Sequence, residues 1–287
     1  MELPFADRVR AADDRLSPAE ARVAHYLADH REELLRASAS ALARSSGTSD
    51  ATVVRTAKAL GFTGLDDLRR AVADELRRDL SPAGRVARTL QAVGDGAGSA
   101  FAATLDLHRE AIDALARSVP PERFEATLDR VLAADRIAVF GIGPSGAIAA
   151  YLAIQLGRFG IEATALTETG LRLADRLLRL RHGDLVLLLA YGRVYGEVRA
   201  TLDRADELGL RRVLITDSLG PGLAGRVDLV LEVPRGRVDT MSLHTATLAF
   251  VEAMLVGIAA RRPAETLESL RDLNRLRTAV AGPDTVL

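Results

Sequence analysis

The chain has 287 residues, of which 48% are hydrophobic and 27% charged, a composition typical of a soluble globular protein with about two domains. It contains no cysteine, which excludes disulfides, thiolate zinc sites and a cysteine nucleophile. The net charge is −1, and residues 1–80 carry 13 basic and 14 acidic side chains, so overall charge gives no indication of nucleic-acid binding. The amino terminus lacks a basic stretch followed by an apolar run, which predicts a cytoplasmic protein.

The pattern of residues 1–80 is helical throughout. Ser17, Pro18 and Glu20 predict a helix start with a capping box, and the apolar spacing over 23–27 continues that helix. Further helices are expected at about 38–44, 49–60 and 65–79.

Residues 41–55 have the spacing of a helix-turn-helix. Such a motif needs a small residue where its two helices cross, a glycine or similar residue in a left-handed turn, and an aliphatic residue inside the second helix. Ala43, Gly47 and Val53 supply these three, and Ser49 can cap the second helix. A plain helical bundle with a glycine turn is the alternative, because this spacing is common.

The amino-terminal end of the second helix is the part that enters the major groove in such motifs. Arg55 is expected to pair with guanine or phosphate, and the hydroxyls of Ser49 and Thr52 with phosphate or base edges. The expected place of Ser49, Thr52 and Arg55, together with Asp50, is on or near the outer face of the helix. The predicted DNA-binding residues are Arg44, Ser49, Asp50, Thr52, Arg55 and Lys58.

The sequence around this motif resembles the RpiR family of transcriptional regulators. The segments that carry the resemblance are 16–20, 23–27, 49–55, 59–62 and 64–69. It covers most of residues 5–80 and implies an all-α helix-turn-helix domain that binds DNA. Thr56 departs from the pattern, which has a larger apolar or aromatic residue there.

Residues 81–100 are rich in glycine, with proline and serine at their start, and this composition predicts a linker. The predicted division is therefore a helix-turn-helix domain at 1–80, a linker at 81–100 that is partly helical, and an effector-sensing and oligomerisation domain at 101–287.

After residue 100, apolar runs alternate with helical segments, which predicts an α/β domain with a five-stranded parallel sheet flanked by helices. The expected strands are 137–140, 163–166, 185–189, 213–216 and 229–233. The expected flanking helices are 101–117, 121–133, 241–261 and 264–279.

A glycine-rich loop follows the first expected strand and opens a helix. Gly141, Gly143 and Gly146 form the dinucleotide-binding pattern G-x-G-x-x-G, and Glu168 stands where a ribose-binding acid would. Glycines and a helix amino terminus suit any anion. One interpretation of this loop is therefore that the chain is a nicotinamide-dependent enzyme.

The order of motifs resembles a different α/β domain, the SIS (sugar isomerase) domain. Its resemblance spans about 133–235 and includes Gly-x-Gly-x-Ser at 141–145 and Gly183-Asp184 before the third strand. RpiR-type regulators join a helix-turn-helix and an SIS domain in this order, so the combination implies a Rossmann-like sensor of a small metabolite.

One departure concerns the loop after the third strand, where SIS domains that hold sugar phosphates usually read Ser-x-Ser-Gly-x-Thr. Here Ala190, Gly192 and Tyr195 replace the three hydroxyl residues. Arg193 and two tyrosines could rebuild an anion site, which leaves three possibilities open: a phosphosugar, a different ligand or no ligand. The predicted effector-binding residues are Gly141, Gly143, Ser145, Tyr191, Gly192, Arg193, Tyr195, Thr216, Asp217 and Ser218.

The sequence as a whole predicts an effector-responsive regulator that binds operator DNA as a homodimer or homotetramer, with no catalytic residue, metal, cofactor or membrane span. The helices at 101–117 and 241–261 are the candidates for subunit contacts, and His244 is expected to be structural. Three alternatives stay open: a nicotinamide-dependent enzyme, a sugar-phosphate isomerase, and a sensor whose helical head binds protein.

Overall fold

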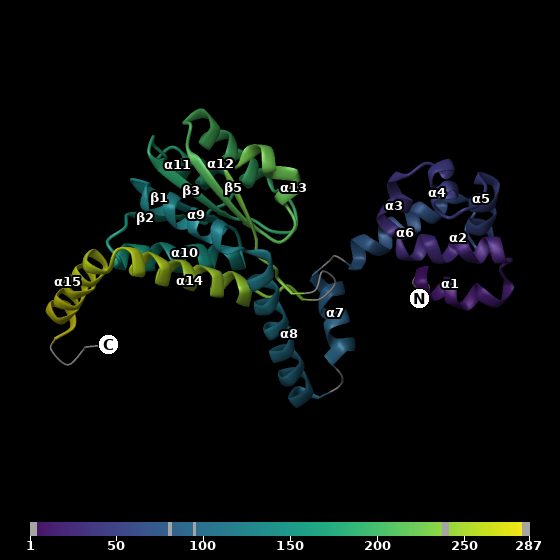
Figure 1. Cartoon of the computed structure of the whole chain (residues 1–287), viewed down its shortest axis with the longest axis horizontal. Helices are drawn as coiled ribbons and strands as arrows, with labels where there is room; N and C mark the ends of the chain where they lie inside the picture. The colour runs from purple at the N-terminus through teal and green to yellow at the C-terminus, as the bar shows by residue number, and fades with distance from the viewer. Residues whose placement is uncertain (1–4, 80–81, 94–95, 237–240, 283–287) are drawn as a thin grey trace. The chain divides into compact units, whose positions relative to one another are not determined.

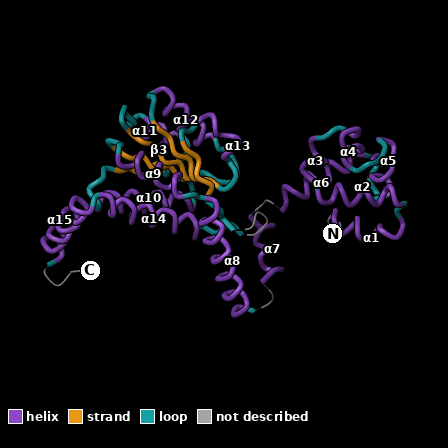
Figure 2. Tube along the Cα trace, in the orientation of Figure 1, coloured by secondary structure: helices purple, strands orange, loops and turns teal. Residues whose placement is uncertain are grey.

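The computed structural model describes residues 5–79, 82–93, 96–236 and 241–282. These residues form two compact units, with the boundary between Ala92 and Val93 and with Met241 grouped in the first unit. Figure 1 traces the elements along the chain. Figure 2 shows that the strands belong to the second unit, whereas the first is built of helices and loops.

The first unit confirms the predicted helical domain. Its described helices are α1 (Phe5–Ala12), a 3-10 turn (Asp13–Arg15), α2 (Pro18–Asp29), α3 (Arg31–Arg36), α4 (Ala39–Ser45), α5 (Asp50–Ala59), α6 (Leu65–Asp79) and α7 (Pro82–Val93), whose last residue falls in the second unit. The capping box at the start of α2 is present: Ser17 N donates to Glu20 Oε2 (3.0 Å), and Glu20 N donates to Ser17 Oγ (3.4 Å). Two of the backbone amides that a helix start leaves unpaired are thereby satisfied.

One apolar core joins α1 to α6. Its buried side chains include Phe5, Leu27, Leu34, Leu42, Val53 and Leu68. The buried residues of α5 recur at helical spacing on one side of the helix, so the core fixes which face of α5 points inward and which faces solvent.

The second unit is built on the predicted parallel sheet. Its strands are β1 (Arg136–Gly141), β2 (Ala163–Leu166), β3 (Asp184–Leu189), β4 (Arg211–Thr216) and β5 (Leu229–Glu232). They run in the order β2-β1-β3-β4-β5, and every neighbouring pair is parallel. The five-stranded parallel sheet is therefore confirmed. The order reverses between β1 and β3, and open α/β sheets bind ligands beyond the carboxyl ends of strands at such a point.

Helices cover both faces of the sheet (Figure 1), which explains why every residue of β3 is buried. One face packs on α8 (Ala97–Ser118), α9 (Pro121–Leu132), α10 (Pro144–Arg158) and α14 (Thr245–Arg261). The other packs on α11 (Leu171–Leu177), α12 (Gly196–Glu207) and the short α13 (Gly220–Leu223). Helix α15 (Pro263–Ala281) ends the described chain and contacts α10 and α14.

The segment expected to be a partly helical linker is helical over most of its described length, in α7 (Pro82–Val93) and the start of α8. One helix start differs from the sequence-based expectation. The apolar helix expected from 241 begins instead at Thr245: residues 237–240 lie outside the described residues, and 241–244 are not helical. Leu243 N donates to the carbonyl of Arg235 (3.0 Å), so the backbone at 243 bonds back to the segment after β5.

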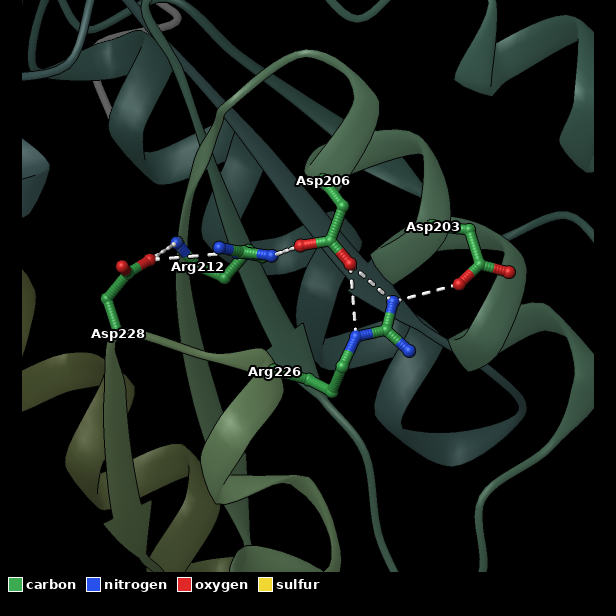
Figure 3. A network of polar contacts seen from close by, with 5 residues as sticks. All are labelled: Asp203, Asp206, Arg212, Arg226 and Asp228. Atoms are coloured by element: carbon green, nitrogen blue, oxygen red, sulfur yellow. Dashed lines mark hydrogen bonds and ion pairs between the residues drawn. The ribbon is translucent and has the colours of Figure 1, made fainter.

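A polar network ties the amino end of β4 to its neighbours (Figure 3). Arg226, in the turn before β5, bonds Asp203 (2.8 Å) and Asp206 (2.6 Å) of α12. Arg212 pairs with Asp206 and also donates its backbone N–H to Asp228 Oδ2 (2.6 Å). These contacts lie at the opposite end of β4 from the expected effector cleft.

Candidate functional site

The connection between α4 and α5 has the backbone of the predicted turn. Gly47 takes a positive φ of 64°, which a glycine adopts without steric cost. Thr48 N donates to Ala43 O (2.8 Å), closing the end of α4. Ser49 then caps α5, because its hydroxyl accepts from Thr52 N (3.3 Å).

The inner face of α5 includes one residue that was expected outside. Val53 and Ala57 are fully buried, as predicted, but Thr52 is only 5% exposed. Its hydroxyl meets Ser49 Oγ (2.9 Å) and accepts from Arg55 Nη2 (3.3 Å). The placement of Thr52 on the outer face is therefore wrong: the side chain is buried, although its hydroxyl still bonds Ser49 and Arg55.

The other predicted DNA-binding residues, Arg44, Ser49, Asp50, Arg55 and Lys58, are all exposed. The Ser49 hydroxyl caps the helix, and Asp50 accepts a hydrogen bond from Ser40 Oγ (2.5 Å). The exposed face also presents Val54, which is 36% exposed and which sequence reasoning missed. The sequence could have indicated the exposure of Val54, because this residue precedes Arg55 and does not share the spacing of the inward-facing Val53 and Ala57. Such a face offers cations and one apolar side chain, the latter suited to a thymine methyl group.

At the end of β1, the glycine loop serves close packing of α10 on the strand. A Cβ on Gly141 would lie 2.5 Å from Ser145 O, and one on Gly146 would lie 2.9 Å from Gly141 O. Gly143 has a positive φ of 61°. Ser145 is buried, and its hydroxyl donates to Ile142 O (2.9 Å) and accepts from Ile142 N (3.2 Å). The loop's own backbone thus uses the hydroxyl that we expected to contact effector.

The loop after β3 divides into an inner and an outer part. Tyr191 is 8% exposed and points back into the domain, whereas Arg193 and Tyr195 are exposed. The Arg193 guanidinium lies 4.4 Å from the centre of the Tyr195 ring, in cation–π contact. Gly192 has a positive φ of 72°. The structure therefore separates the predicted loop residues into a buried tyrosine and an exposed arginine–tyrosine pair.

The end of β4 contributes a turn and a carboxylate. Thr216 is fully buried, and its hydroxyl accepts from Leu219 N (3.0 Å), which is a structural use. Asp217 Oδ1 accepts from Gly192 N (3.2 Å) and from Ser218 Oγ (2.9 Å). The predicted residues Gly192, Asp217 and Ser218 are thereby brought together across two strands.

Three residues of this cluster were missed or given no ligand role. Arg235 lies with its guanidinium over the Tyr191 ring (4.4 Å) and pairs with Asp217 (2.7 Å). His244 meets the same ring edge-on, with centroids 5.6 Å apart. Thr247 shares a hydrogen bond with the Tyr191 hydroxyl (2.9 Å). Arg235 follows β5 after Val233 and Pro234, at the end of the segment that resembles SIS domains and in none of its quoted motifs, so only the fold places it near Asp217.

The electrostatics of the cluster follow from its burial. Burial raises the pKa of the Tyr191 hydroxyl, which keeps it protonated. Burial, aided by the positive charge of Arg235, lowers the pKa of His244, so this ring is neutral near pH 7. Burial alone would raise the pKa of Asp217, but the hydrogen bonds and charge of Arg235 outweigh it and hold that pKa below its usual range.

Glu168, the candidate ribose acid, is held elsewhere. Its Oε1 accepts from Arg176 Nε (2.6 Å). Burial acts to raise the pKa of Glu168, but this bond and the other contacts lower it overall. A carboxylate tied to an arginine in this way is a poor proton acceptor near pH 7.

Among the cavities of the described residues, two of about 200 and 220 Å³ lie near the amino ends of the strands. The cavity of about 200 Å³ is lined by Arg136, Glu162 and Asp184, among others. The cluster around Asp217 lies instead at the carboxyl ends, where α/β sheets bind ligands. Within the described residues, no group of three metal-ligating side chains is found, and no helix is long and apolar enough to cross a membrane.

Comparison with known proteins gives the family. A helix-turn-helix model of the rpiR family matches residues 4–79, and an SIS-domain model matches residues 131–257. The sugar isomerase domain of an RpiR transcription factor from Sphaerobacter thermophilus is 32% identical over 58% of this chain and 94% of that one, with a TM-score of 0.54. This chain belongs to the RpiR family of transcriptional regulators.

Two further relatives bear on this RpiR-family chain. The Vibrio vulnificus NanR protein, solved in complex with ManNAc-6P, is 22% identical over 96% of this chain and 99% of that one, with a TM-score of 0.59, and shares the fold. The bifunctional protein glk of Paraburkholderia xenovorans is 29% identical over 260 residues, which are 89% of this chain and 40% of that protein. This chain therefore spans less than half the length of that relative.

Proposed function

We propose that this regulator binds operator DNA through α5 and senses a small anionic metabolite at the carboxyl edge of its SIS sheet. The observation that carries the proposal is the capped α4–α5 turn with Arg55 and Lys58 exposed beside it, in a chain of the RpiR family. Such a helix presents its amino-terminal residues to base edges in the major groove.

Arg55 has the central role in DNA binding. Its guanidinium is exposed on the first turns of α5 and is anchored to Thr52 Oγ1 (3.3 Å). Arginine is suited to paired hydrogen bonds with guanine O6 and N7. Arg44 and Lys58 flank it and suit phosphate contacts, which orient a protein on the duplex without reading its sequence.

A gel-shift titration on the DNA upstream of the chain's own gene tests this proposal. We expect specific binding by the wild type and a loss of about 1–3 kcal/mol in Arg55→Ala. Arg10→Ala, which removes an exposed arginine from α1, is the matched control and should bind as the wild type does. Absence of specific binding by the wild type at low salt, where electrostatic attraction is strongest, would refute DNA binding and favour a protein-binding head.

The effector is proposed to be a phosphosugar or another small anion. NanR shares the fold and is described in complex with ManNAc-6P, which makes sugar phosphates the first compounds to try. In this chain the carboxyl edge of the sheet offers Arg193, Arg235 and the amide of Gly192, instead of the three hydroxyls expected at 190, 192 and 195. A thermal-shift screen should therefore cover sugar phosphates and sugar acids alike.

The active form is proposed to be a cytoplasmic homodimer or homotetramer, because paired half-sites on DNA mirror protein symmetry. Exposed apolar side chains on the predicted contact helices support this: Val256 of α14 is 70% exposed, and Phe101 of α8 is 68% exposed. Apolar side chains left on a helix surface favour burial against a second subunit.

We further propose that the chain is not an enzyme. Glu168 is neutralised by Arg176, and Ser145 is bonded within its own loop, which leaves neither in a state suited to proton transfer. Incubation with aldose and ketose phosphates should give no isomerisation, and calorimetric titration with NAD and NADP should give no heat of binding. Turnover of any sugar phosphate by the purified chain would overturn this part of the proposal.

A further inference from the structure

The carboxylate of Asp217 occupies an oxyanion site built by three separate segments. Its Oδ2 accepts from Arg235 Nε (2.9 Å) and Nη2 (2.7 Å). Its Oδ1 accepts from the backbone N–H of Gly192 (3.2 Å) and from Ser218 Oγ (2.9 Å). A carboxylate has about four acceptor positions, so these four donors satisfy it completely.

The donors converge at the expected effector cleft. Gly192 belongs to the loop after β3, Ser218 follows β4, and Arg235 follows β5, so all three lie at the carboxyl edge of the sheet. The loop around Gly192 is the one that resembles the phosphate loop of SIS domains but lacks its hydroxyls. An anionic group of the protein itself, the Asp217 carboxylate, therefore already occupies this edge of the sheet.

Arg235 is held in place independently of Asp217. Its guanidinium lies over the ring of Tyr191 (4.4 Å), and that ring is fixed by the hydrogen bond to Thr247 and by edge contact with His244. The Arg235 side chain is only 14% exposed, whereas that of Asp217 is 23% exposed. The guanidinium would thus keep its direction when the carboxylate turns toward water.

We propose that Arg235 and the Gly192 amide bind the acidic group of the effector, and that Asp217 is a built-in competitor for this position. The inference rests on the proposed effector site and names its chemistry: the ligand is a small metabolite bearing a phosphate or a carboxylate. Two anions a few Å apart repel each other strongly, so the ion pair and the bound effector exclude each other. Effector binding must displace the Asp217 carboxylate. The observed affinity therefore depends on how much more strongly the shared donors bind the effector anion than they bind Asp217.

The test is calorimetric titration of the full chain with sodium phosphate and, separately, with sodium acetate, at an ionic strength held constant with sodium chloride. Asp217→Asn should bind one of these anions at least tenfold more tightly than the wild type. Adding Arg235→Ala to that variant should abolish the gain. A gain for phosphate alone identifies a phosphate ester as the ligand class, and a gain for acetate alone identifies a carboxylate.

Asp203→Asn is the matched control, because it removes the same charge beside Arg226, among contacts near the opposite end of β4 (Figure 3). No gain with either anion, or an equal gain in Asp203→Asn, overturns the inference. If Asp217→Asn is unfolded in anion-free solution, refolding on addition of phosphate or acetate supports the inference, and its absence overturns it. A gel shift separates the two proposals: retained DNA binding without a gain in anion affinity refutes the competitor role alone.

Discussion

The hydroxyl groups of Tyr191 and Thr247 share a hydrogen bond of 2.9 Å, and both side chains are buried. The bond joins the loop after β3 to the first turn of α14. Tyr191→Phe leaves the Thr247 hydroxyl without this partner, and a buried polar group that loses its partner costs about 1–3 kcal/mol. We expect a loss of that size in urea unfolding, followed by circular dichroism because the chain has no tryptophan. Tyr195→Phe, at a side chain 41% exposed, should change stability by less than about 0.5 kcal/mol.

Gly141→Ala should destabilise the second unit. The added methyl group would lie 2.5 Å from Ser145 O and 2.7 Å from Ser145 C, which are backbone atoms of α10. Forcing the helix from the strand costs about 1–3 kcal/mol, as overpacking does elsewhere. Gly157→Ala is the control: it lies within α10 with no atom near the new methyl group, so it should be neutral or stabilising by up to about 1 kcal/mol. Equal effects of the two substitutions on the urea midpoint would contradict this assignment.

Asp217→Asn should lower the free energy of unfolding by about 1–3 kcal/mol at pH 7, because Arg235 loses its partner while remaining largely buried. The pKa of Asp217 is lower in the folded chain than its ordinary value. Its contribution is therefore complete above the ordinary carboxyl pKa of about 3.9 and is lost as the pH falls through the lower folded value.

The difference in stability between the wild type and Asp217→Asn should therefore stay constant from neutral pH down to about pH 5 and shrink below about pH 4. Urea titrations in sodium chloride held by a pH-stat avoid phosphate and carboxylate buffers, which are themselves proposed ligands. Asp203→Asn, at a side chain 64% exposed, should show only a small difference at every pH. A difference that grows on acidification would contradict the sign of this prediction.

Val256→Glu should disrupt the proposed subunit contact without unfolding the subunit. Val256 is 70% exposed, so the new carboxylate is solvated in the monomer and should change its stability by less than about 0.5 kcal/mol. Light scattering should show a multiple of 30.7 kDa for the wild type and a smaller assembly for the variant. Val280→Glu, at an exposed position of α15, serves as the control. An unchanged mass for Val256→Glu would exclude α14 as the contact.

Local patterns in the sequence predicted most of the fold. The Ser17–Glu20 capping box, the Gly47 turn and the five apolar strands depend on neighbouring residues, and the structure has all of them. Thr52 was placed wrongly because threonine has a methyl and a hydroxyl group, and polarity alone does not say which one faces the core. Its position beside Val53, one turn before the equally buried Thr56, was the overlooked signal.

The chemistry of the cleft was harder to predict, because it depends on contacts between distant segments. Asp217 and Arg235 are 18 residues apart and follow different strands, and no local pattern pairs them. Ser145 and Thr216 were singled out as hydroxyl donors, yet both bond to nearby backbone. Serine and threonine at strand ends commonly satisfy turns in this way, so residue type at an expected position did not separate ligand contact from local structure.

The hydrogen bond from Arg55 to Thr52 Oγ1 means that a side chain facing the solvent is ordered by one facing the core. Immobilising a long side chain at an interface costs about 0.5–1.5 kcal/mol of conformational entropy, and this bond meets part of that cost before DNA arrives. If Arg55 contacts the operator as proposed, Thr52 influences operator affinity without touching the DNA, and Thr52→Val should weaken operator binding by removing the hydroxyl that orders Arg55.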